Sequence, residues 1–285
     1  MATGENKVVV DPVSGPQVLA APELIALAEH LDELANAVAP LQGQVSKNPK
    51  TAAIVLAGGS GERFGQAGGK QLFELLGKPL LTWAAEAFDA VADVGLIVVV
   101  CPEDRMDEYL RVAIDPYPFV TPIVLAPAGE LRQESSLSGV MRVPSDYELI
   151  AIHDGARPLI TPDLIGHAIS LLKGDDSLDG AVVGHPAIDT LKVVADGTVI
   201  GTPERSAFWI AQTPQVFRSD IIREAHTTAL AEGFVGTDDS SLVERVGGIV
   251  SFVTGPRDNI KVTVPEDFGP AEAALLARIH KRNGI

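Results

Sequence analysis

A glycine-rich stretch that carries two cations is the segment of this sequence best suited to chemistry. Residues 58–71 read GGSGERFGQAGGKQ and follow an apolar run at residues 52–57. Glycines after a buried strand let backbone N–H groups approach an anion closely, and a following helix adds its positive end. Arg63 and Lys70 would add two positive charges. The segment therefore predicts a phosphate loop, and its two cations suit a reacting triphosphate better than a passively bound pyrophosphate.

The spacing within this loop disfavours two common nucleotide-binding patterns. A P-loop would need a glycine at position 64 and a serine or threonine after Lys70, where the chain has Phe64 and Gln71. The dinucleotide pattern GxGxxG, started at Gly59 and Gly61, would also need a glycine at position 64. A nicotinamide cofactor is therefore disfavoured. A glycine-rich turn with two solvated cations remains the alternative to a phosphate loop.

Two further motifs place charged side chains directly after apolar runs. HDGARP, residues 153–158, brings Asp154 and Arg157, and DNIKVT, residues 258–263, brings Lys261. A carboxylate in such a position can hold a ribose hydroxyl or Mg²⁺, and a guanidinium can hold a phosphate. Taken alone, the first motif suits equally well a turn closed by Asp154 and paired to Arg157. Lys261 taken alone suits a solvated surface charge.

The elements that must position these residues alternate along the chain. Short apolar runs predict strands at residues 52–57, 96–101, 121–126, 148–154, 181–186 and 248–255. Helical spacing predicts helices at residues 79–91, 103–112, 133–141, 162–172, 219–231 and 265–281. This alternation predicts a Rossmann-like, three-layer α/β fold with a mostly parallel sheet covered on both faces. Ligands of such sheets bind at the carboxyl ends of the strands, where the charged motifs fall.

Two segments stand apart from this pattern. Residues 1–50 predict an N-terminal extension, with one amphipathic helix at 22–38 and a polar linker at 41–50. Residues 51–285 form the predicted catalytic domain. Within it, residues 187–209 predict a projecting hairpin with Asp196 and Gly197 at its turn.

Composition limits the partners that the chain could have. Its 22 basic and 38 acidic residues give a formal net charge of −16, which argues against binding to nucleic acid or to an anionic membrane. Its single cysteine, Cys101, excludes an internal disulfide, and the sequence lacks a CxxC motif or His/Cys cluster for zinc. No apolar run approaches the roughly 18 residues of a membrane helix. We expect a soluble cytoplasmic protein whose phosphate chemistry depends on a local group of cations.

The motifs taken together resemble one enzyme family. LAGGSGERFG, the KQ pair and GKPLL are similar to the start of nucleotidyltransferases that activate sugar or alditol phosphates. HDGARP, DTLK, AQTPQVF, TDDSSLVE and DNIKVTVPEDF then resemble, in order, 2-C-methyl-D-erythritol 4-phosphate cytidylyltransferases. The resemblance covers residues 52–278. It implies cytidylyl transfer from CTP to this polyol phosphate in non-mevalonate isoprenoid synthesis, with Mg²⁺ as cofactor. It also implies a homodimer that exchanges the arm at 187–209.

The resemblance assigns roles residue by residue. Arg63 and Lys70 would stabilise the transition state, and Lys261 and Arg205 would hold the acceptor phosphate. The implied nucleotide-binding residues are Ala57, Gly58, Gly59, Gly61, Gly129, Arg132, Ser135 and Asp154, of which Asp154 is also the candidate Mg²⁺ ligand. The implied acceptor-binding residues are Arg157, Thr190 and Thr237. His153 and His185 are interpreted as core or hydrogen-bonding histidines, since an attacking phosphate oxygen is already anionic and needs no base.

The chain departs from the family pattern at two places in the loop. Gly69 stands where the family usually has proline, and LAGG replaces the usual AAG start. LAGG is also similar to molybdenum-cofactor guanylyltransferases, so the identity of the nucleotide base remains open. Two alternative functions remain: a ribitol 5-phosphate cytidylyltransferase, and a nucleotide-binding module without turnover.

Overall fold

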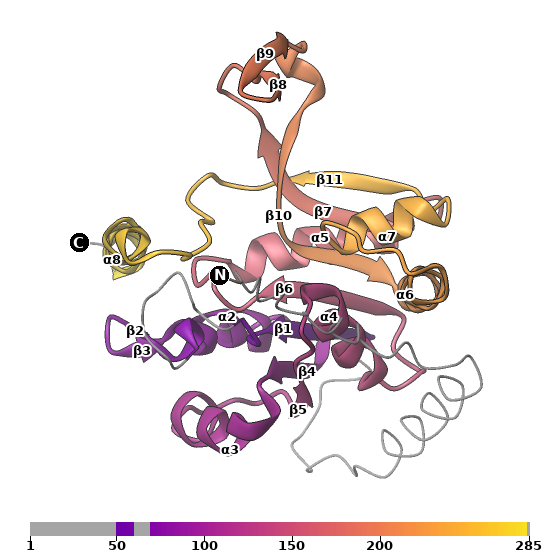
Figure 1. The fold of residues 1–285 in the computed structure, drawn as a ribbon. Coiled ribbons are helices and arrows are strands. Elements are labelled where there is room, and N and C mark those ends of the chain that lie inside the picture. The colour runs from indigo at the N-terminus through magenta and orange to yellow at the C-terminus, as the bar shows by residue number, and fades with distance from the viewer. Residues whose placement is uncertain (1–49, 60–68, 284–285) are drawn as a thin grey trace, which may run out of the picture.

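A seven-stranded sheet forms the centre of the molecule (Figure 1). The computed structural model describes residues 50–59 and 69–283, and the predicted helix at 22–38 lies outside them. The strand order is β11-β7-β10-β6-β1-β4-β5. The strands of this sheet are β1 (Thr51–Leu56), β4 (Val94–Cys101), β5 (Ile123–Pro127), β6 (Leu149–Asp154), β7 (Gly180–Pro186), β10 (Trp209–Arg218) and β11 (Val250–Thr254). Each of the six predicted strands is present, to within a few residues at its ends.

The sheet is parallel except for β10, which runs antiparallel to β6 and β7. The predicted mostly parallel sheet is thus confirmed, but β10 was not among the predicted strands. Its sequence carries Gln212, Thr213 and Pro214 in the middle, and a proline and polar residues argue against a central strand. The register between β10 and β7 shifts between Ala211 and Gln215, so residues 212–214 do not pair with β7.

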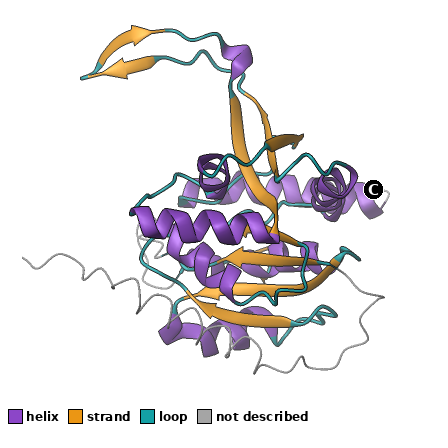
Figure 2. Ribbon diagram, turned by 90° about the vertical axis from the view of Figure 1, so that its right-hand side faces the viewer, coloured by secondary structure: helices purple, strands orange, loops and turns teal. Residues whose placement is uncertain are grey.

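Helices cover both faces of the sheet (Figure 2). They are α2 (Leu80–Asp89), α3 (Met106–Tyr109), α4 (Arg132–Met141), α5 (Pro162–Gly174), α6 (Ser219–Glu232), α7 (Asp239–Arg245) and α8 (Phe268–Asn283). One buried cluster joins α2, α3 and α5 to one face, and a second joins α4, α6 and α7 to the other. Along β1, Ala53 and Val55 belong to the first cluster while Ile54 belongs to the second, because successive side chains point to opposite faces.

Two helical segments differ from the prediction. The predicted helix at 103–112 is a 3₁₀ turn η3 (Glu103–Arg105), then α3, then a π-helical segment η4 (Leu110–Ile114). Helix α7 was not predicted, because its seven residues, DSSLVER, are too few for a clear helical period. Helix α8 follows a 3₁₀ turn η6 (Pro265–Asp267) and packs, in a separate small cluster, against β2 (Glu74–Leu75), which pairs with the other short strand β3 (Lys78–Pro79).

The predicted hairpin arm is confirmed as a local structure. Strands β8 (Val193–Ala195) and β9 (Thr198–Gly201) pair antiparallel around Asp196 and Gly197, both with positive φ (47° and 75°) as a tight hairpin turn requires. Figures 1 and 2 show the arm projecting from the body of the protein beyond β7 and β10. No helix within residues 50–59 and 69–283 is long and apolar enough to cross a membrane.

Candidate active site

The carboxylate of Asp154, at the end of β6, is the centre of a group of cations. Its Oδ2 lies 2.8 Å from Lys261 Nζ and 3.7 Å from Arg157 Nε, and its Oδ1 lies 3.3 Å from Arg132 Nε. Burial alone would raise the pKa of Asp154, but Arg132, Lys261 and Arg157 outweigh burial and hold that pKa well below its ordinary value. The four side chains come from a strand end, two loops and a helix N-terminus, all at the carboxyl edge of the sheet, as the sequence predicted.

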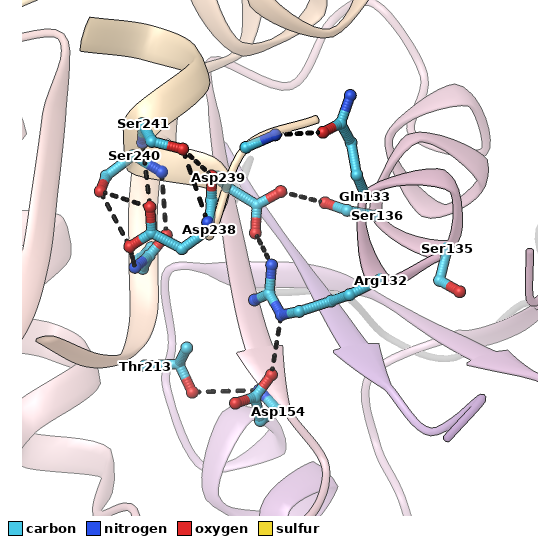
Figure 3. Close-up of polar contacts among 12 residues, drawn as sticks. Arg132, Gln133, Ser135, Ser136, Asp154, Thr213, Asp238, Asp239, Ser240 and Ser241 are labelled. Carbon is cyan, nitrogen blue, oxygen red and sulfur yellow. Dashed lines mark hydrogen bonds and ion pairs between the residues drawn. The ribbon is translucent and has the colours of Figure 1, made fainter. Parts of the chain in front are cut away.

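Arg132 connects this group to a second buried carboxylate (Figure 3). It lies in the first turn of α4, and its Nη1 donates to Asp239 Oδ2 at 2.7 Å. Asp239 is 1% exposed and accepts a further hydrogen bond from Ser136 Oγ at 2.5 Å. Burial would lower the pKa of Arg132, but the carboxylates of Asp239 and Asp154 raise it overall. Arg132 therefore remains charged at any working pH.

Thr213 fixes the backbone and the histidine beside Asp154. Its Oγ1 accepts the Asp154 N–H at 3.0 Å and lies 3.1 Å from His153 Nδ1. His153 Nε2 lies 3.2 Å from the carbonyl oxygen of Arg157, which can only accept, so Nε2 carries the proton. Nδ1 is then the acceptor of the Thr213 hydroxyl. His153 is fully buried and bonded at both nitrogens, which confirms the interpretation of a hydrogen-bonding core histidine.

We predict that burial of His153 makes the protein less stable as the pH falls from 6.5 to 4. Burial is the main cause that lowers the His153 pKa from 6.5 to about 4. Between these values the unfolded chain takes up a proton that the folded protein does not, so the free energy of unfolding should fall by up to about 3 kcal/mol. Urea unfolding across this range checks this, with His153→Gln as the comparison. A variant as sensitive to pH as the wild type would contradict the assignment, since Asp154 and Asp239 are present in both proteins and their effect on stability cancels in the comparison.

The loop that carries Lys261 is held by Asn259. Asn259 is fully buried, and its Nδ2 donates to Gln212 Oε1 at 3.1 Å and to the Thr213 carbonyl at 3.0 Å. The main-chain carbonyl of Asn259 accepts a hydrogen bond from Arg157 Nη1 at 2.8 Å. The loop after β11 is therefore attached both to β10 and to the HDGARP segment. This attachment brings Lys261 to Asp154.

The two described ends of the glycine loop meet at Tyr109. The Tyr109 hydroxyl donates to the Ala57 carbonyl at 3.0 Å, and it lies 2.6 Å from where a Cβ on Gly69 would stand. Gly69 has φ +61°, a value that proline cannot adopt. The backbone before Lys70 therefore has a conformation that the proline usual in the family could not take. Lys70 begins a 3₁₀ turn η2 (Lys70–Leu72). Arg63 and Gly61 lie outside the described residues.

The start of the loop also touches the segment predicted to bind the base. A Cβ on Gly58 would stand 2.2 Å from that of Ala128, so only glycine allows this approach. Gly59 follows it in the described part of the loop. Ser135 is buried, and its Oγ accepts the Gly129 N–H at 3.1 Å. The predicted nucleotide-binding residues that the structure describes thus lie just after β1, in the loop after β5, at the start of α4 and, for Asp154, at the end of β6.

The remaining predicted residues divide into two groups. Thr237 shares a small cavity with Arg132 and Asp239, close to the cation group. Thr190 and Arg205 lie on the exposed arm, where Arg205 Nη1 donates to the Ile188 carbonyl at 2.5 Å. Within one chain the arm projects away from the body, so these two residues contribute to a site only if a second chain receives the arm (Figure 1).

A resident metal site does not fit the described residues. No group of three His, Cys, Asp or Glu side chains in residues 50–59 and 69–283 could hold a metal ion. Both oxygens of Asp154, the predicted Mg²⁺ ligand, already face cations. The site is built for anions.

Sequence reasoning assigned no individual role to Thr213, Asp239 or Asn259. Each lies in a motif that carried the family resemblance: AQTPQVF, TDDSSLVE and DNIKVT. Only their buried contacts with Asp154, Arg132 and Arg157 give them a part in the site.

An open α/β sheet with a glycine loop and converging cations at its carboxyl edge fits the class of nucleotidyltransferases. The family model of IspD, 2-C-methyl-D-erythritol 4-phosphate cytidylyltransferase, matches residues 51–277. The chain belongs to this family, as its motifs led us to expect.

Individual relatives agree with this assignment. The cytidylyltransferase of Geobacter metallireducens is 40% identical over 230 residues, covering 80% of this chain and 98% of the relative, and that of Geotalea uraniireducens is 41% identical over 228 residues, covering 79% and 97%. Among solved structures, 4-diphosphocytidyl-2C-methyl-D-erythritol synthase from Anaerococcus prevotii matches with a TM-score of 0.70 at 28% identity, covering 79% of this chain and 96% of the other. The cytidylyltransferase of Thermus thermophilus matches with a TM-score of 0.64 at 28% identity, covering 80% and 98%.

Proposed function

We propose that this chain transfers a cytidylyl group from CTP to 2-C-methyl-D-erythritol 4-phosphate and releases pyrophosphate, as a step of non-mevalonate isoprenoid synthesis. The observation that carries the proposal is the convergence of Arg132, Arg157 and Lys261 on Asp154, in a chain of this family. Three cations around two carboxylates, Asp154 and Asp239, leave an excess of one positive charge, which suits substrates that carry phosphates.

The reaction needs positioning and charge relief more than acid–base chemistry. An oxygen of the acceptor phosphate attacks the α-phosphorus of CTP in line, and the bond from that phosphorus to the bridging oxygen breaks as pyrophosphate leaves. No proton has to move. Lys261 and Arg157 hold the attacking phosphate, and Lys261 is 39% exposed in its side chain and so reachable from solvent. Lys70 and Arg63 relieve the charge that builds up on the α-phosphate.

The nucleotide lies on the other side of Asp154. Ala57, Gly58 and Gly59 bind the phosphates through their backbone N–H groups, and the family resemblance assigns Gly61 to the same role. Gly129, Arg132 and Ser135 bind the cytosine end. Mg²⁺ enters bound to the phosphates of CTP, as part of the substrate. Thr237 contacts the acceptor, and the protein works in the cytoplasm, where its lone Cys101 stays reduced.

We also propose that the arm makes the protein a homodimer and lends Thr190 and Arg205 to the partner's site. The supporting observation is an apolar surface on the arm that one chain leaves uncovered. Its exposed side chains are Ile188, Val193, Val194, Val199, Ile200 and Phe208. So many exposed apolar side chains on one projecting hairpin favour a protein partner.

We predict that Ile200→Asp converts a dimer into monomers. Ile200 is 66% exposed at the end of the arm, and a carboxylate there would be buried unpaired in a dimer interface. Sedimentation velocity should give twice the mass of one chain for the wild type and a single chain for the variant. Val120→Asp, at an equally exposed position (70%) outside the arm, is the matched control and should remain dimeric. A wild type that sediments as a monomer with full activity would exclude the arm exchange.

The activity itself is tested by pyrophosphate release from CTP and Mg²⁺. Methylerythritol phosphate and ribitol 5-phosphate serve as rival acceptors, with GTP and ATP as nucleotide controls. The proposal expects release only with CTP and methylerythritol phosphate, and loss of release when EDTA removes Mg²⁺. A preference for ribitol 5-phosphate would contradict the proposed acceptor. Absence of pyrophosphate release with every pair of substrates would favour a nucleotide-binding module without turnover.

A further inference from the structure

Two carboxylates hold Arg132 from opposite sides, and only one of them lies among the acceptor-facing cations (Figure 3). Asp154 Oδ1 meets Arg132 Nε at 3.3 Å, whereas Asp239 Oδ2 meets Nη1 at 2.7 Å. The shorter contact is to the deeper carboxylate, since Asp239 is 1% exposed. Asp239 therefore restrains the guanidinium more strongly than Asp154 does.

Asp239 is itself fixed from three elements. It begins α7, its Oδ1 accepts from Ser136 Oγ of α4 at 2.5 Å, and His226 Nε2 of α6 lies 3.3 Å from the same oxygen. His226 is 1% exposed, and neither of its ring nitrogens makes a hydrogen bond within the described residues, so it packs closely beside Asp239 without bonding to it. A carboxylate with so few ways to move can hold its partner in one orientation.

We propose that Asp239 is a positioning residue that fixes the guanidinium of Arg132 for the nucleotide. Asp239 does not touch the acceptor-side cations Lys261 and Arg157, so its effect reaches the reaction through Arg132. This inference depends on the proposed function, in which Arg132 faces CTP. It goes further by assigning the orientation of that arginine to a carboxylate that is not itself a ligand of the substrate.

The test is Asp239→Asn, which keeps the shape and removes the charge. We expect the KM for CTP and the Kd for CTP from calorimetry to rise about 10- to 100-fold, the range for loss of a charge-assisted hydrogen bond. The KM for methylerythritol phosphate should change less than about twofold. An unchanged Kd for CTP in a folded variant would overturn the proposal. Failure of the proposed function would instead appear in the wild type, as absence of pyrophosphate release.

A double-mutant cycle separates positioning from a general structural effect. If Asp239 acts through Arg132, then Arg132→Met with Asp239→Asn should bind CTP no more weakly than Arg132→Met alone. Additive losses would contradict the proposal. Asp238→Asn is the matched control, because Asp238 caps α7 through Ser241 and accepts from Gln215 Nε2 at 2.7 Å, and it makes no hydrogen bond or ion pair with Arg132. It should lower stability yet leave the Kd for CTP unchanged.

A measurement on the unsubstituted protein keeps the inference testable if Asp239→Asn does not fold. In ¹⁵N NMR, the Nη groups of Arg132 should show hindered rotation and slow hydrogen exchange, both before and after CTP is added. Free rotation of the guanidinium in the CTP complex would overturn the proposal.

Discussion

Replacing Lys70 by alanine is expected to lower kcat about 100-fold or more while the protein remains folded. Lys70 lies near the start of the glycine loop, because the preceding Gly69 packs closely against the Tyr109 hydroxyl that donates to Ala57. A cation at this place meets more negative charge in the transition state than in the bound substrates, so its loss affects kcat more than KM. Steady-state kinetics with CTP and methylerythritol phosphate measure the effect.

The matched control for this prediction is Lys173→Ala. The Lys173 ammonium pairs with Asp93 at 2.6 Å on the surface, where an ion pair contributes about 1 kcal/mol or less. We expect this variant to retain turnover within about twofold, because it removes one positive charge from the protein but none from the site. Turnover close to normal in Lys70→Ala would show that the loop binds phosphate without acting on the transition state.

The sequence alone was enough to place Asp154, Arg157 and Lys261 at one edge of the sheet. Each follows an apolar run, and parallel strands bring their carboxyl ends together, so residues more than 100 positions apart could be expected to meet. The pairing of Asp154 with Arg157 was one of the two alternatives for the HDGARP motif, whereas the pairing of Asp154 with Lys261 was not predicted. It depends on Asn259, whose amide joins the Lys261 loop to β10, a strand that its internal proline and polar residues concealed.

The contact between Arg132 and Asp239 was even harder to predict from the sequence. It requires α4 and α7 to pack on the same face of the sheet, and α7 is a single short helix without a readable period. Local rules succeeded where the geometry is local, as in the turn at Asp196 and Gly197. They failed where two side chains 107 residues apart meet inside the protein.

The negative charge of Asp154 should contribute strongly to stability. Asp154→Asn leaves Lys261 and Arg157 without a counterion, and breaking a buried ion pair from one side costs about 3–5 kcal/mol. Urea unfolding at pH 7 measures the loss. Asp258→Asn is the matched control, because Asp258 lies on the loop that carries Lys261 and pairs with Arg278 at 2.8 Å but is half-exposed. It should cost about 1 kcal/mol or less.

The same variant tests whether Lys261 and Arg157 bind the phosphate of a substrate. In the wild type, an incoming phosphate competes with Asp154 for Lys261 and Arg157, whereas in Asp154→Asn the two cations have no internal counterion. Added inorganic phosphate or pyrophosphate should therefore raise the unfolding temperature of Asp154→Asn more than that of the wild type, since a ligand that binds only the folded state stabilises it. Equal shifts in the two proteins would mean that the phosphate of the acceptor binds elsewhere, and that Asp154 serves the fold alone.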